Sequence, residues 1–123
     1  MRDELGGAKD LRTKRFALRV ICLFSALPKK AETQVIGKQL LHSGTSVGAH
    51  YREAVRSRSD AEFISKIEGG LQELEESIYW MELLVESGII KTERLNELMK
   101  EADELTAILV TCVKNTKQRK RKK

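Results

Sequence analysis

Histidine and cysteine side chains are the groups in this sequence best suited to metal binding or nucleophilic chemistry. His42 and His50 are eight residues apart, and no H-E-x-x-H pattern surrounds either. On a helix their side chains would point roughly 80° apart, which disfavours a shared metal ion. Cys22 and Cys112 lie in apolar runs and form no C-x-x-C pair, so we expect core thiols. These patterns predict no catalytic residue, no metal site and no cofactor.

Acidic residues are abundant in the second half of the chain, where they could form a di-iron site. Such sites in helical bundles need a Glu-x-x-His pair on each of two helices. Residues 59–113 contain no histidine. We therefore expect Glu73, Glu75, Glu76 and Glu82 to be solvated or to pair with basic residues elsewhere in the chain.

Small residues form a run over positions 43–49, and two further glycines stand at positions 69 and 70. The run lacks the G-x-x-x-x-G-K-[ST] spacing of a phosphate-binding loop. We expect Gly44 and Gly48 to permit close approach of a second helix; the alternative is a ligand-contact surface. Gly69 and Gly70 should each cost roughly 1 kcal/mol relative to alanine. They indicate either tight packing or a bend in the helix.

Basic residues fall into two groups that could bind nucleic acid. The first group, the basic strip, consists of Lys38, Arg52, Arg56 and Arg58, which we expect to face solvent. The second, the basic tail, consists of Lys114, Lys117, Arg119, Lys120, Arg121, Lys122 and Lys123. Together they favour binding of RNA or DNA through phosphates, without sequence readout. The alternative is that the charges serve solubility and assembly.

The elements that must position these residues belong to one small domain of 123 residues. Residues 9–58 carry eleven basic and three acidic side chains, whereas residues 59–113 carry four basic and thirteen acidic ones. The net charge of +5 therefore comes from the tail. No apolar stretch approaches the roughly 20 residues of a membrane span. The acidic start of the chain is unlike a signal peptide, so we expect a cytoplasmic protein.

Four amphipathic helices are predicted. The first spans residues 9–27 and stops at Pro28; the second spans residues 32–56. Ser59 and Glu62 form a capping box before the third, which Gly88 ends, and the fourth spans residues 92–115. Short loops between such helices specify an all-α, up-down-up-down antiparallel four-helix bundle. We assign residues 1–8 to a flexible N-terminus, 9–116 to the bundle and 117–123 to a disordered basic tail.

The first helix is apolar over more than half of its circumference. Leu11, Leu18 and Ile21 widen the core-facing stripe beyond what neighbours within one bundle normally cover. Exposed apolar surface of this kind marks interfaces. The pattern predicts a homo-oligomer, and the basic and acidic halves could complement each other within or between subunits.

Two blocks of the sequence resemble a known bacterial family. They are residues 43–54, SGTSVGAHYREA, and residues 61–84, of which AEFISKI and ELEESIYWMELL carry the resemblance. Both are similar to the 23S ribosomal RNA intervening-sequence proteins, over roughly residues 9–113. His50 departs from the asparagine usual in that family, and Gly69 and Gly70 replace better helix formers.

The resemblance implies an antiparallel bundle that assembles into a ring-like homopentamer without enzymatic activity. It also suggests kinship with the accessory variability proteins of diversity-generating retroelements, which associate with a reverse transcriptase and bind nucleic acid. We therefore expect a non-catalytic oligomer that binds RNA or DNA and serves as an accessory to a nucleic-acid enzyme. The competing hypothesis is a protein-interaction scaffold with no nucleic-acid role.

Overall fold

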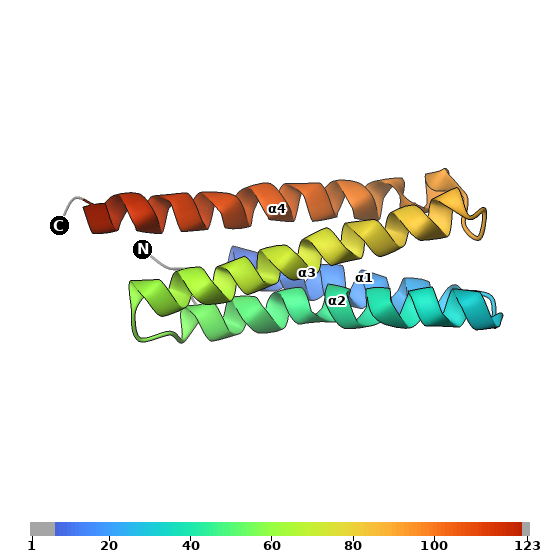
Figure 1. Cartoon of the computed structure of the whole chain (residues 1–123), viewed down its shortest axis with the longest axis horizontal. Helices are drawn as coiled ribbons and strands as arrows, with labels where there is room; N and C mark the ends of the chain where they lie inside the picture. Colours follow the sequence, from blue (N-terminus) through green and yellow to red (C-terminus); the bar gives the residue numbers. More distant parts are fainter. Residues whose placement is uncertain (1–6, 122–123) are drawn as a thin grey trace.

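Four long helices make up the structure, a computed structural model that describes residues 7–121 (Figure 1). They are α1 (Ala8–Ala26), α2 (Ala31–Val55), α3 (Asp60–Glu86) and α4 (Thr92–Arg121). Each runs antiparallel to the helix before it, and α1 also contacts α4. Over the described residues no strand forms, and no helix is long and apolar enough to cross a membrane. The predicted antiparallel four-helix bundle is confirmed.

Local sequence signals set most of the helix ends. The chain leaves α1 at Leu27, directly before Pro28. The Ser59 hydroxyl caps α3 by accepting a hydrogen bond from the Glu62 amide at 3.1 Å. The Glu62 carboxylate accepts from the Arg58 amide at 3.5 Å rather than from Ser59, so the capping box is incomplete. Gly88 has φ +80°, the left-handed conformation expected after a helix end.

The end of α4 differs from the prediction. The helix continues to Arg121, so residues 117–121 are not a disordered tail; Lys122 and Lys123 lie outside the described residues. The chain contains no helix breaker after Asn115, and lysine, arginine and glutamine favour helix. Positive charge near a helix C-terminus also interacts favourably with the helix dipole. These residues extend α4 beyond the start of α3 (Figure 1).

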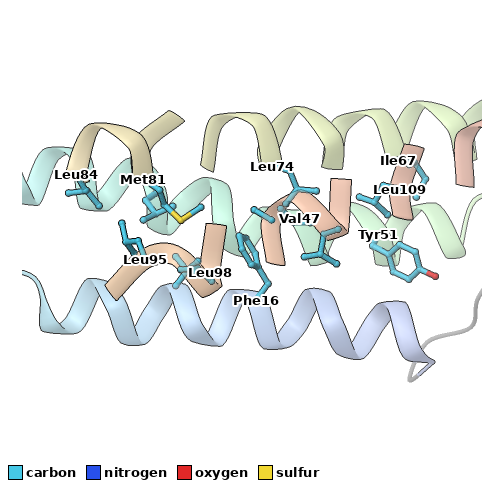
Figure 2. Packing of buried hydrophobic residues seen from close by; sticks show 14 of the residues in the cluster. Phe16, Val47, Tyr51, Ile67, Leu74, Met81, Leu84, Leu95, Leu98 and Leu109 are labelled. Atoms are coloured by element: carbon cyan, nitrogen blue, oxygen red, sulfur yellow. The ribbon is translucent and has the colours of Figure 1, made fainter. Parts of the chain in front are cut away.

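The hydrophobic core runs the length of the bundle and receives side chains from all four helices (Figure 2). Phe16 of α1 points into its centre, against residues of α2, α3 and α4. One polar pair crosses this core: the hydroxyls of Ser43 and Ser77 lie 2.8 Å apart and join α2 to α3. Because both residues are buried, this bond satisfies groups that would otherwise be costly to desolvate.

Close helix approach explains the glycines of α2. A Cβ atom at Gly44 would lie 2.8 Å from Val20 Cγ2, and one at Gly48 would lie 3.3 Å from Thr13 Oγ1. Both contacts are with α1. The prediction that Gly44 and Gly48 permit tight helix packing is therefore confirmed.

Gly69 makes room for the half-buried imidazole of His50. A Cβ atom at Gly69 would lie 2.9 Å from both Cε1 and Nδ1 of that ring. At Gly70 the nearest atom would be Leu109 Cδ1, at 3.5 Å. Of the two explanations offered by the sequence, tight packing therefore applies at Gly69, where a side chain of α2 lies against the backbone of α3.

Ion pairs join α1 to α4. These two helices make the smallest helix–helix contact among the described residues. Arg12 donates to Glu101 through two nitrogens, at 2.6 and 3.1 Å, and to Glu104 at 3.1 Å. The hydrogen bond to Glu101 is the main reason that the pKa of Arg12 is raised. Arg19, two turns further along α1, lies 3.8 Å from Glu97. The basic and acidic halves of the sequence thus complement each other within one chain.

The two cysteines occupy different environments. Cys112 is half-buried on α4, whereas Cys22 is exposed on α1. The expectation of a core thiol is therefore wrong for Cys22. It lies beside Leu18 and Ile21, on the part of the wide apolar stripe that the bundle does not cover.

Candidate nucleic-acid interface

The basic strip predicted on α2 does not form one continuous patch. Arg56 follows the last turn of α2 and Arg58 lies in the connection to α3; both side chains are exposed. Lys38 is also exposed but lies eighteen residues before Arg56, about 27 Å away along the helix. Only the C-terminal part of the predicted strip can therefore act together.

Arg52 has a partner within the chain and is not a simple solvent-facing cation. Its Nε donates to Asp10 Oδ1 at 2.8 Å, and its Nη2 donates to Asp10 Oδ2 at 3.3 Å. Asp10 is only 3% exposed, while the Arg52 side chain is half-exposed. The hydrogen bond to Asp10 raises the pKa of Arg52 above its ordinary value. Arg52 is exposed, as expected, but it also neutralises a buried carboxylate on α1.

The cations at the end of α4 divide into exposed and anchored side chains. Lys114, Lys120 and Arg121 are exposed. Arg119 donates to Asp60 at 3.1 Å, and Lys117 lies 3.9 Å from Glu68, so both contact α3. These two contacts hold the last turns of α4 against the start of α3.

The antiparallel topology gathers basic residues from separate segments at one end of the bundle. The end of α4, the start of α1 and the α2–α3 connection all lie there (Figure 1). Arg56, Arg58, Lys114, Lys120 and Arg121 form the exposed set that we call the basic end. Lys9 of α1 lines a groove together with Asn115 and Arg119 of α4 and therefore also lies at this end. Its position depends on the antiparallel arrangement of α1 and α4, which no local motif marks.

Histidines and carboxylates do not assemble into a metal site within residues 7–121, where no group of three potential ligands forms. His42 is exposed, and His50 Nε2 lies 3.9 Å from Glu73 Oε2. His50 Nδ1 is buried without a hydrogen-bond partner in the described structure. The ring acts as a packing element between α2 and α3.

Comparison with known proteins agrees with this architecture. Residues 11–111 match the family of the 23S rRNA-intervening sequence protein. A crystal structure of a protein with unknown function, from the S23 ribosomal protein family of Bacteroides thetaiotaomicron, superimposes with a TM-score of 0.81. The two sequences are 34% identical, and the match covers 86% of this chain and 95% of the other. No curated protein matches. The chain belongs to the 23S rRNA-intervening sequence protein family.

Proposed function

We propose that this protein is a non-catalytic, cytoplasmic homo-oligomer that binds RNA or DNA through phosphate contacts at its basic end. The observation that carries the proposal is the convergence of Arg56, Arg58, Lys114, Lys120 and Arg121 at one end of the bundle. Phosphate contacts from lysine and arginine supply most non-specific affinity for nucleic acid. The protein would serve as an accessory to a nucleic-acid enzyme such as a reverse transcriptase.

The local arrangement of charge supports this reading. The acidic residues nearest to the end of α4, Asp60 and Glu68, are engaged by Arg119 and Lys117. Asp10 is likewise engaged by Arg52. These pairs lower the repulsion that a polyanion would meet at this end. Because α4 is helical to Arg121, the backbone that carries its exposed cations is ordered before binding, which reduces the backbone entropy lost on association.

A salt titration with labelled single-stranded RNA tests the proposal. We expect log affinity to fall with log salt by about 0.7 for each phosphate contacted. Replacing Lys114, Lys120 and Arg121 together by glutamine should weaken binding and reduce that slope by about 2, since three contacts are lost. All three side chains are exposed, so the fold should be unaffected.

A matched control removes the same charge from the opposite end of the bundle. Lys29, Lys30 and Lys91 are exposed in the α1–α2 and α3–α4 connections, and their replacement by glutamine should leave the slope almost unchanged. Equal effects of the two triple variants would contradict the basic end as the binding surface. Full-length protein that bound no RNA or DNA at low salt would favour the second candidate, a protein-interaction scaffold.

One observation supports both the scaffold alternative and the proposed homo-oligomer. Leu11, Leu18 and Ile21 on the outer side of α1 are 41%, 54% and 41% exposed. Apolar side chains in such a row are typical of surfaces that are covered by another protein chain. We propose that copies of this chain cover it, and the number five rests on the family resemblance alone.

A further inference from the structure

A groove of about 420 Å³ lies at the basic end, between the start of α1 and the last turns of α4. It exists because the helices are staggered: α1 begins at Ala8, further inside the bundle than the α2–α3 connection, while α4 extends beyond it (Figure 1). Among residues 7–121, nothing therefore covers the last turns of α4 on the side that faces α1 elsewhere. The volume falls within the range of small-ligand sites.

The floor of the groove is apolar and its rim is polar. Phe63 of α3 and Ile108 and Cys112 of α4 line the floor. The exposed side chains of Thr111 and Asn115 stand on α4 at the rim. The Thr111 hydroxyl already donates to the Ala107 carbonyl at 3.0 Å and can still accept, while the Asn115 amide can both donate and accept. Together they suit the mixed donors and acceptors on the edge of a nucleobase.

Cations border this groove on two sides. Lys9 of α1 and Arg119 of α4 belong to its lining, and Arg119 also pairs with Asp60. Lys114 and Lys120 lie within one turn of Asn115 and Arg119 along α4 and are exposed. A flat apolar ligand with attached anionic groups therefore matches the groove and its surroundings better than a neutral or cationic ligand.

We propose that the groove receives one unpaired base of a single-stranded nucleic acid while the basic end holds the adjoining phosphates. This inference rests on the proposed function and refines it, because it names single strands as the bound form. In a duplex the flat faces of the bases are stacked, whereas an unpaired base can turn out of the strand and enter a pocket. Proteins that bind single strands combine a cationic track with surfaces on which bases stack.

The test compares a short single-stranded oligonucleotide with a fully abasic oligonucleotide of the same length and charge. Fluorescence anisotropy should show the base-containing strand binding about tenfold more tightly, the gain typical of one stacked base. RNA and DNA versions of both strands show whether the sugar matters. Ile108→Ala should remove most of this difference, because it takes away apolar surface that would contact the base, without weakening binding of the abasic strand. Val110→Ala, at an exposed position of α4 outside the groove, should leave it intact.

Alkylation of cysteine supplies a second readout that does not depend on affinity. In a Cys22→Ser background, the base-containing strand should slow alkylation of Cys112 in the groove, and the abasic strand should not.

The possible outcomes distinguish failure of the base site from failure of phosphate binding. Equal affinity for base-containing and abasic strands, with equal alkylation of Cys112, would overturn the base site and leave phosphate binding in place. Binding of neither strand at low salt would overturn the proposed function and this inference together.

Discussion

At the scale of single residues, the pair Arg52 and Asp10 shows how a surface charge can serve the fold. Asp10 is almost completely buried, and Arg52 donates two hydrogen bonds to its carboxylate. Removing the cation from a buried pair of this kind is destabilising, because a charge in a poorly solvated site loses part of its compensation. Arg52 is therefore a poor position at which to test nucleic-acid binding alone.

We predict that Arg52→Glu lowers the melting temperature, since it places a second carboxylate beside Asp10. Arg56→Glu makes the same change of charge one helical turn further on, at an exposed position with no such partner among the described contacts, and should melt close to wild type. Thermal unfolding followed by circular dichroism measures both. The structural role of Arg52 would be refuted by equal melting temperatures for the two variants.

At the scale of elements, Gly44 and Gly48 of α2 set the distance between α1 and α2. Val20 is fully buried, so it has little space to move away from a new methyl group at Gly44. We predict that Gly44→Ala destabilises the protein by about 1–3 kcal/mol, despite the better helix propensity of alanine. Urea denaturation gives this free energy directly.

Gly70 of α3 provides the control for this prediction. At Gly70 a Cβ atom would make an ordinary contact with Leu109, so Gly70→Ala should be neutral or stabilise by up to about 1 kcal/mol. A Gly44→Ala variant as stable as Gly70→Ala would show that α1 can move outward at little cost, contrary to the packing argument.

At the scale of the whole molecule, the proposed assembly depends on the exposed apolar face of α1. We predict that the protein is a homopentamer and that Leu18→Glu converts it to folded monomers, because the charge would have to be buried in the interface. Val35→Glu on α2 is the matched control: Val35 is 64% exposed and lies on a different helix. Light scattering coupled to gel filtration reports the mass. A monomeric wild-type protein at micromolar concentration would contradict the prediction.

Local patterns in the sequence determined the number, order and most boundaries of the helices. Pro28, Ser59 and Gly88 act within a few residues of themselves, through fixed backbone geometry, capping and positive φ, and each marks a helix end. The spacing of apolar residues likewise identified core positions such as Leu74 and Leu109, which are buried in the structure. Such signals need no tertiary information because they depend on periodicity and on near neighbours.

Only the tertiary structure decided what depends on distant segments. Asp10 and Arg52 are 42 residues apart, and no local pattern links them. The helical end of α4 is held by Asp60 and Glu68, which its own sequence does not reveal. The groove at the basic end arises from the unequal extension of α1 and α4, which is a property of their packing register. Helices form from short-range interactions, whereas ion pairs and cavities between helices depend on how those helices are aligned.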